Sequence, residues 1–250
     1  MVVRLANKDV DATKIAAFFK YDPHPQDGTL LPANERITFE LAALLDMPIT
    51  SVKFHTHDNM KGHISYVVPG DFEIWNNLEI KFVGTFGTNI QGRVPECFAD
   101  VDTFYAMFVF DTWIANSDRH GGNFIGTLLP GSDKLNLYLI DHGHCILGPA
   151  HQLNSMQQNE QNWYDVSKFT RLPKEVIDLI TDFSQLHSHV AKIEAITNEQ
   201  ITAIVDNIPG EYLSDEHKGL AIRILITRRD KLREMIVDWC KQQGKIKAAI

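Results

Sequence analysis

The chain has 250 residues, 44% of them hydrophobic, and its 32 acidic residues outnumber 24 basic residues to give a formal net charge of −8. That length and apolar content suffice for one large domain or for two lobes with a buried core. The negative balance repels nucleic acids and anionic membranes, so neither is expected as a partner.

The spacing of the cysteines and the length of the apolar segments indicate the cellular compartment. Cys97, Cys145 and Cys240 are far apart and form no CxxC pair, which favours a reducing compartment over a disulfide framework. The N-terminus lacks a basic region followed by an apolar run, and no stretch approaches the ~18 apolar residues that a membrane span needs. We expect a soluble, cytoplasmic protein.

Residues 1–70 predict a small lobe of strands with one helix. Apolar runs at Val2–Ala6 and Lys14–Tyr21 predict a hairpin around the polar segment Asn7–Thr13. Apolar residues at three- and four-residue steps predict a helix from about Asn34 to Leu45, which Asp46-Met47-Pro48 ends. Two further strands are predicted, Val52–His55 and His63–Val68.

Residues 71–250 predict a mainly helical lobe with one hairpin. A strongly apolar helix begins near Asp100 or Asp102 and leads into Asn116–Asn123. Strands at Phe124–Leu129 and Leu135–Ile140 form the hairpin. Four later helices are predicted, Lys174–Phe183, Leu186–Ile196, Glu199–Asn207 and Asp215–Lys241. The sequence thus predicts an α+β chain of two lobes, joined without a Gly- or Ser-rich linker.

Three polar residues of the second lobe have the spacing of a phosphotransferase. Asp118 is followed by Asn123 five residues on, and by Asp141 at the end of the next hairpin. In kinases an Asp of the catalytic loop accepts the substrate hydroxyl proton, while an Asn and a second Asp hold Mg²⁺ against the phosphates. We therefore predict Asp118 as the catalytic carboxylate, with Asn123 and Asp141 as magnesium ligands.

Phosphoryl transfer from ATP also needs a cation on the phosphates. Lys20 closes a predicted strand and Glu35 opens the following helix, so we predict that Lys20 contacts the phosphates and that Glu35 holds it. Rivals exist in the same lobe, namely Lys8, Lys14 and Lys53 for the lysine and Glu40 for the glutamate. The adenine is expected near Val68, in the segment Val67–Gly70.

Two features leave other functions open. The first predicted hairpin loop, Asn7–Asp11, has no glycine and carries two acids, so its backbone is poorly suited to cradling phosphates. A pseudokinase or nucleotide-sensing binding module is therefore one alternative. A metal-dependent hydrolase is the other. It would use the clustered Asp118, His120, Asp141, His142 and His144.

A cluster of basic residues lies on the last predicted helix. It comprises Arg228, Arg229, Lys231 and Arg233. Cations suit the C-terminal part of a helix because of the helix dipole, so we interpret the cluster as a solvated face.

Several segments of the chain carry a family resemblance. They are Phe18–Tyr21 followed by Asn34-Glu35, Phe110–Arg119 with Asn123, Tyr138–His144, and the C-terminal runs Ile204–Pro209 and Arg228–Leu232. Together they resemble the HipA-like kinases, in particular the small bacterial HipA-like kinase domain. The match covers nearly the whole chain and is most specific in the two segments around Asp118 and Asp141.

The resemblance implies a two-lobed protein-kinase-like fold, use of ATP with Mg²⁺, and transfer to a hydroxyl, usually of a protein serine or threonine. It implies Lys20 as the phosphate lysine, Asp118 as the catalytic residue, and Asn123 and Asp141 as metal ligands. It does not name the phosphoacceptor, and the chain departs from the family in its short first lobe and in its loop without glycine.

Overall fold

The computed structural model describes most of the chain, and every structural statement below concerns the residues it describes. They are 2–5, 15–21, 30–66, 71–75, 77–78, 94–128, 131–149, 153, 157, 159–164 and 172–244. The loop Asn7–Asp11 and the adenine-side residue Val68 lie outside them, as do the rival lysines Lys8 and Lys14.

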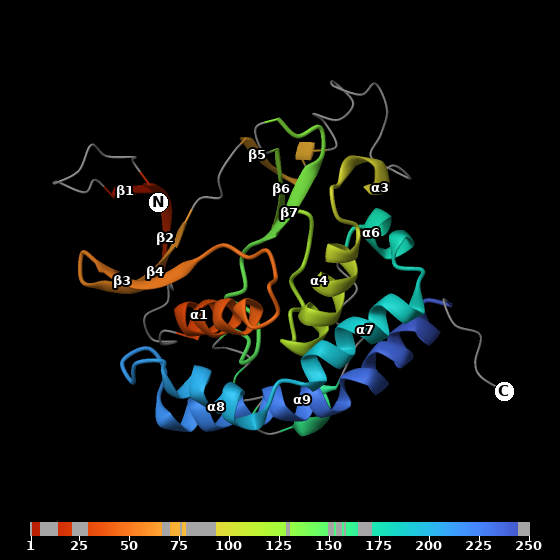
Figure 1. Cartoon of the computed structure of the whole chain (residues 1–250). Coiled ribbons are helices and arrows are strands. Elements are labelled where there is room, and N and C mark those ends of the chain that lie inside the picture. The colour runs from red at the N-terminus through yellow and green to blue at the C-terminus, as the bar shows by residue number, and fades with distance from the viewer. Residues whose placement is uncertain are drawn as a thin grey trace.

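The first lobe is built on a four-stranded antiparallel sheet with the order β1-β2-β4-β3. Its strands are β1 (Val2–Leu5), β2 (Ile15–Tyr21), β3 (Val52–His57) and β4 (Met60–Tyr66). Helix α1 (Leu30–Ala43) packs against this sheet (Figure 1). The register sets Lys20 of β2 opposite His63 of β4, so the two side chains share the face of the sheet.

Helix α1 begins at Leu30 rather than at Asn34, the predicted start. Pro32 falls in the first turn, where a backbone N–H has no partner within the helix, so this proline does not interrupt it. The earlier start places Glu35 in the second turn, one turn after Leu31 and on the same face of the helix.

A three-stranded antiparallel sheet with the order β5-β6-β7 belongs to the second lobe. Its strands are β5 (Asp71–Ile74), β6 (Phe124–Leu128) and β7 (Leu135–Leu139). The hairpin of β6 and β7 is the one predicted from the sequence, whereas β5 was not predicted. The first sheet therefore draws on residues before 70 and the second on residues after it, and the division into lobes at 1–70 and 71–250 stays a prediction.

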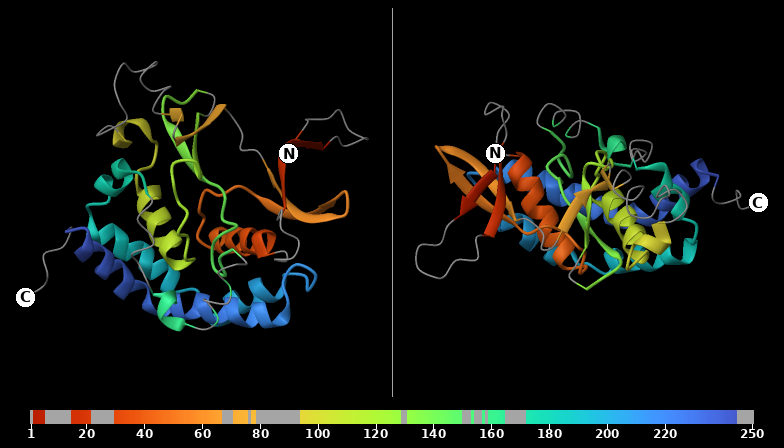
Figure 2. Two further views of the ribbon diagram at one scale, coloured as in Figure 1. Left: turned by 180° about the vertical axis from the view of Figure 1, so that it is seen from behind. Right: turned by 90° about the horizontal axis from the view of Figure 1, so that it is seen from above.

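Helices form most of the second lobe. They are α3 (Val94–Cys97), α4 (Asp102–Trp113), α6 (Lys174–Leu179), α7 (Phe183–Glu194), α8 (Asn198–Asp206) and α9 (Asp215–Gln242), with a 3-10 turn at Glu160–Trp163. The buried helix α4 packs against α7 and α9, while α8 contacts α1 (Figures 1 and 2). In the described part of the chain, no helix combines the length and apolarity required to cross a membrane.

The predicted break between the helices α6 and α7 was also wrong, because it falls earlier in the chain than expected. The side chain of Asp182 accepts hydrogen bonds from the backbone N–H groups of Ser184 and Gln185. An aspartate in this capping position satisfies N–H groups that have no partner within the helix. Helix α7 therefore begins at Phe183, which the sequence pattern had placed at the end of the preceding helix.

The interpretation of the basic cluster on α9 as a solvated face was wrong for two of its residues. Arg228 and Arg229 are only 1% and 9% exposed. Arg228 donates from Nε to the carbonyl oxygen of Trp113 (2.8 Å) and from Nη2 to that of Thr112. These carbonyls end helix α4, where acceptors lack partners within the helix, so a buried guanidinium caps the helix from the core.

The two lobes are joined by backbone pairing close to the site. The backbone N–H of Leu139 in β7 donates to the carbonyl of Pro48 (2.8 Å), and the carbonyl of Leu139 accepts from the N–H of Thr50 (3.3 Å). The chain that leaves α1 is therefore attached to β7 two residues before Asp141. This pairing fixes α1 relative to the predicted metal loop.

Candidate active site

Four of the predicted residues border one cavity of about 380 Å³. Lys20 lies in β2 and Glu35 in α1. Asp118 lies in the loop after α4, and Asp141 is the second residue after β7. Its further lining residues are Phe19, Tyr21, Leu31, His63, Gly143 and His144. The volume lies within the range of roughly 300–1,000 Å³ that is usual for small-molecule sites.

Lys20 lies between two carboxylates. Its Nζ donates to Oδ1 of Asp141 (3.0 Å) and lies 3.9 Å from Oε1 of Glu35. The rival Glu40 instead forms an ion pair with Arg36, one turn earlier in α1. The rival Lys53 lies over the ring of Tyr66, 5.7 Å from its centroid. The fold thus brings Lys20 to Glu35 and Asp141.

Asp118 and Asn123 are held by the loop that follows α4. The backbone N–H of Asp118 donates to Oδ1 of Asn116 (3.1 Å), and Nδ2 of the buried Asn123 donates to the carbonyl oxygen of Asp118 (2.7 Å). These bonds close the loop on itself and leave the Asp118 carboxylate directed to the cavity, where it is 28% exposed.

Arg119 joins the segments that carry the predicted residues. This buried side chain forms two hydrogen bonds with the carboxylate of Asp111 (2.8 and 3.0 Å). It also donates to the carbonyl oxygens of Asn123 and Ile140, the latter at 2.9 Å. Burial alone would lower the pKa of Arg119, but the charge of Asp111 raises it, so the guanidinium stays protonated.

His142, next to Asp141, is buried between a cation and an anion. Its Nε2 lies 2.6 Å from Nη2 of Arg119, and its Nδ1 lies 3.7 Å from Oε2 of Glu35. Burial, reinforced by the charge of Arg119, lowers the pKa of His142 below its ordinary value. The imidazole is therefore neutral at pH 7.

Glu35 is a buried carboxylate that stays ionised. Burial alone would raise its pKa, but His142, His63 and Lys20 together lower it to about 2. Nε2 of His63 lies 3.8 Å from Oε1 of Glu35. Burial lowers the pKa of His63 as well, so this second imidazole beside Glu35 is also neutral at pH 7.

The loops that carry Asp118 and Asp141 contain residues with an uncommon backbone conformation. Asp141 (φ 65°), Ala115 (φ 58°) and Ile146 (φ 57°) are all in the left-handed region. Outside glycine such conformations cost energy and persist only where neighbours hold them. Here Nδ2 of Asn34 donates to the carbonyl oxygen of Gly143 (2.8 Å), and the N–H of Ile146 donates to the carbonyl oxygen of Ile114 (2.7 Å).

The residues predicted to hold Mg²⁺ fit that ion in chemical type. The Asp141 side chain is 51% exposed and borders the cavity. Nδ2 of Asn123 donates to the backbone oxygen of Asp118, so the side-chain oxygen Oδ1 of Asn123 is the atom suited to a cation. Magnesium prefers a few such oxygen ligands and completes its shell with water and phosphate. The ammonium of Lys20 compensates the charge of Asp141 in this structure.

The metal-dependent hydrolase gains no support from the arrangement of its five residues. His120 and His144 lie 4.0 and 3.8 Å from Oδ2 of Asp118, but Nε2 of His142 faces the cation Arg119. In the part of the chain that the structure describes, no group of three or more His, Cys, Asp or Glu side chains could hold a metal ion.

Sequence reasoning missed the roles of Asp111, Arg119 and His63. Asp111 and Arg119 were read only as parts of a motif, and His63 only as a strand residue. A signal did exist for Asp111, because a carboxylate on an otherwise apolar helix is rarely buried without a partner. The position of His63 depends on the register between β2 and β4, which no local sequence pattern predicts.

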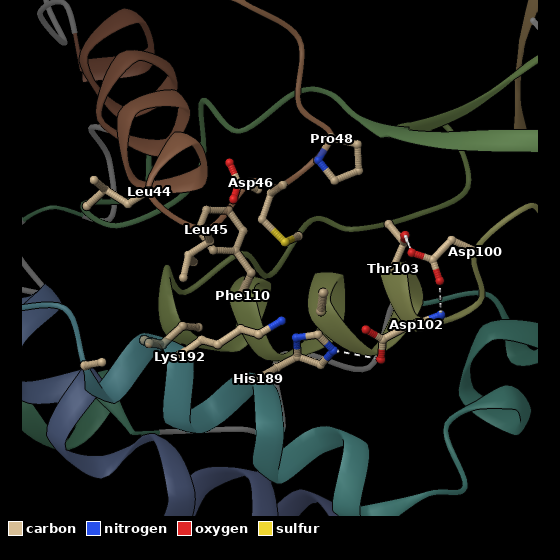
Figure 3. A pocket seen from close by; sticks show the side chains of 14 residues that line it. Leu44, Leu45, Asp46, Pro48, Asp100, Asp102, Thr103, Phe110, His189 and Lys192 are labelled. Atoms are coloured by element: carbon tan, nitrogen blue, oxygen red, sulfur yellow. Dashed lines mark hydrogen bonds and ion pairs between the residues drawn. The ribbon is translucent and has the colours of Figure 1, made fainter.

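A larger cavity of about 510 Å³ lies between the end of α1, the start of α4 and α7 (Figure 3). Leu45, Phe110 and Ile193 contribute apolar walls, and Nε2 of His189 donates to Oδ1 of Asp102 (2.9 Å). None of the described candidate residues borders it. The smaller cavity is therefore the candidate active site, because it alone of the two combines a lysine with the predicted carboxylates.

Comparison with solved structures identifies the fold. The crystal structure of the Helicobacter pylori proinflammatory kinase CtkA is similar with a TM-score of 0.65 at 17% sequence identity, over 93% of this chain and 90% of that chain. HipA of the Shewanella oneidensis MR-1 toxin–antitoxin system, solved with HipB and operator DNA, gives a TM-score of 0.45 at 15% identity, over 88% of this chain and 60% of that chain. No protein-family model and no curated protein matches the sequence.

The likeness to CtkA confirms the predicted fold class. The chain has an α+β, two-lobed kinase fold with a small strand-rich lobe and a mainly helical lobe. The resemblance to HipA-like kinases noted in the sequence is thereby confirmed at the level of the fold.

Proposed function

We propose that this chain, whose fold is that of a solved kinase, is an ATP- and magnesium-dependent phosphotransferase that acts on a serine or threonine hydroxyl of a protein. The observation that supports this most is the cavity bordered by Lys20, Glu35, Asp118 and Asp141. Four separate segments of the chain contribute these side chains. A cation, an anion that holds it, and two carboxylates are the groups that phosphoryl transfer requires.

In this proposal each residue has one role. Lys20 binds phosphate oxygens of ATP and is kept in place by Glu35. Asn123 and Asp141 hold Mg²⁺, which neutralises phosphate charge when bound. Asp118 accepts a hydrogen bond from the acceptor hydroxyl and takes its proton as the hydroxyl oxygen bonds to the terminal phosphorus and the bond to ADP breaks.

A nucleotide-binding module without transfer is the second candidate. The sequence of the loop Asn7–Asp11 favours it, because a loop without glycine and with two acids is a poor phosphate cradle. In either case we propose the cytoplasm as the compartment, in keeping with the wide spacing of Cys97, Cys145 and Cys240, which form no CxxC pair.

Thermal unfolding with and without ATP and Mg²⁺ tests the nucleotide site. A ligand at about 100 times its dissociation constant stabilises the folded state by about 2.7 kcal/mol, which gives a measurable rise in Tm. We expect this rise for the wild type and for Asp118→Ala, and its loss in Asp141→Asn. No rise for the wild type at millimolar ATP would refute the proposal.

Transfer of ³²P from γ-labelled ATP to protein then separates the two candidates. The wild type is expected to label itself or a protein acceptor, and Asp118→Ala is expected to lose the label while keeping its rise in Tm. A wild type that binds ATP but transfers nothing would establish the binding module. Retained labelling in Asp118→Ala would contradict the role of Asp118.

A further inference from the structure

Glu35 is the meeting point of three nitrogen groups in the interior of the site. Nζ of Lys20, Nε2 of His63 and Nδ1 of His142 lie 3.9, 3.8 and 3.7 Å from its carboxylate oxygens. All three distances are slightly longer than a hydrogen bond. The orientation of Glu35 therefore depends on which of these neighbours can donate to it.

Arg119 determines where the proton of His142 resides. A guanidinium has only N–H donors, so the contact of 2.6 Å requires Nε2 of His142 to be the acceptor. A ring whose Nε2 accepts this hydrogen bond carries its single proton on Nδ1, the nitrogen that faces Glu35. Nδ1 is buried and has no hydrogen-bond partner among the described residues. A small shift of the Glu35 carboxylate would satisfy both groups.

We propose that His142 is a positioning residue, which Arg119 holds as the Nδ1-protonated neutral tautomer so that its N–H orients Glu35 and thereby Lys20. This inference rests on the proposed function. It connects Asp111 and Arg119 in the helical lobe to Lys20 in the strand-rich lobe through buried groups. Placement of the phosphate lysine then depends on the segment that also carries Asp141.

Nitrogen NMR of the wild-type protein tests the tautomer without reference to activity. The ¹⁵N shifts and couplings of an imidazole distinguish protonation at Nδ1 from protonation at Nε2, and His142→Asn identifies the signal by its loss. We expect the Nδ1-protonated form at pH 7. An Nε2-protonated or fully protonated His142 would overturn the proposal, whatever the chain proves to catalyse.

Three substitutions separate the two nitrogens. The amide of His142→Asn places an N–H near the position of Nδ1, the amide of His142→Gln reaches the position of Nε2, and His142→Leu provides neither. The measured quantities are the dissociation constant of a fluorescent ATP analogue, the KM for ATP and the kcat of ³²P transfer. His189→Asn is the matched control, because His189 is a buried histidine of the same lobe that borders the other cavity.

We expect His142→Leu and His142→Gln to weaken analogue binding and raise KM by about tenfold, the size of one hydrogen bond to a charged group. His142→Asn should retain most of the affinity, and His189→Asn should match the wild type. Equal losses in His142→Asn and His142→Leu would overturn the proposal. So would normal affinity in all three variants. A wild type that neither binds nor transfers would refute the proposed function, while the NMR measurement would still decide the tautomer.

Discussion

At the scale of single residues, the site is organised by buried charges that are shared among neighbours. Glu35 is 4% exposed yet remains ionised, because Lys20, His63 and His142 surround it. An ionised group of this kind is costly to bury alone, so it is kept only where several partners compensate it. Its environment differs from that of Glu40, which lies one turn and a half later and pairs with Arg36 near the surface.

Stability should depend on the ionisation of Glu35 in acid. Its pKa falls from the ordinary 4.5 to about 2 on folding. Because the folded value is the lower one, its contribution is fully present above pH ~4.5 and is lost as pH falls towards ~2. The difference corresponds to on the order of 3 kcal/mol. Urea unfolding between pH 5 and pH 2 should show this loss in the wild type.

Glu35→Gln is the comparison for that measurement, since glutamine keeps the size of the side chain and removes the titrating group. Between pH 5 and pH 2, the free energy of unfolding of Glu35→Gln should fall less than that of the wild type. The difference between the two falls should be about 3 kcal/mol. Parallel curves for the two proteins would show that the pKa of Glu35 is not lowered by folding.

At the scale of elements, helix α4 delivers the loop that carries Asp118, and its end is held by a neighbouring helix. Nε1 of Trp113 donates to the carbonyl oxygen of Leu225 (2.9 Å), while Arg228 donates back to Trp113. The exchange of bonds in both directions fixes α4 against α9. Burial lowers the pKa of Arg228 to about 9, which leaves it charged at pH 7 and able to cap the helix.

Arg228→Met should therefore destabilise the protein far more than an arginine substitution on the helix surface. Methionine fills much of the volume but leaves the buried carbonyls of Thr112 and Trp113 without this donor, at a cost of about 3 kcal/mol. The matched control is Arg233→Met on the same helix. Arg233 pairs with Glu194 at the surface, and its replacement should cost less than about 1 kcal/mol in urea unfolding.

Similar losses in the two arginine variants would contradict the capping role of Arg228. A variant of Arg228 that is normally stable but has lost phosphate transfer would also contradict it, because that outcome would place the residue in the chemistry rather than in the support of α4.

At the scale of the whole molecule, the two lobes are connected at two places. Backbone pairing of Pro48 and Thr50 with Leu139 attaches the end of α1 to β7. The ring of Phe54 in β3 stacks on that of Tyr212, between α8 and α9, with centroids 4.0 Å apart. Together these contacts restrict rotation of the strand-rich lobe over the helical lobe.

A double-mutant cycle on Phe54→Ala and Tyr212→Ala measures the second connection. An aromatic pair of this geometry contributes about 1 kcal/mol beyond the effect of the area it buries. The double variant should therefore lose less free energy of unfolding than the sum of the two single losses, by about that amount. Tyr212→Phe keeps the stacked ring and removes the hydroxyl that donates to the carbonyl oxygen of His55 (3.5 Å), so it should lose much less stability than Tyr212→Ala. Fully additive losses would show that the stack does not couple the lobes.

The sequence by itself determined the features that depend on short stretches of chain. Helix α4, the hairpin of β6 and β7 and the spacing of Asp118, Asn123 and Asp141 all follow from local patterns. Helical and strand periods are properties of neighbouring residues, and a hairpin places its own ends together. The pairing of Lys20 with Glu35 was predicted from their order along the chain, and the structure brings them to 3.9 Å.

Only the tertiary structure decided the features that depend on distant packing. Arg228 was expected on a solvated face and is buried, and β5 joins the second sheet without having been predicted. The tautomer of His142 depends on Arg119, 23 residues earlier, and the charge of Glu35 depends on groups from three other segments of the chain. Burial and electrostatic environment arise when separate segments exclude water together, so they cannot be read from any single segment.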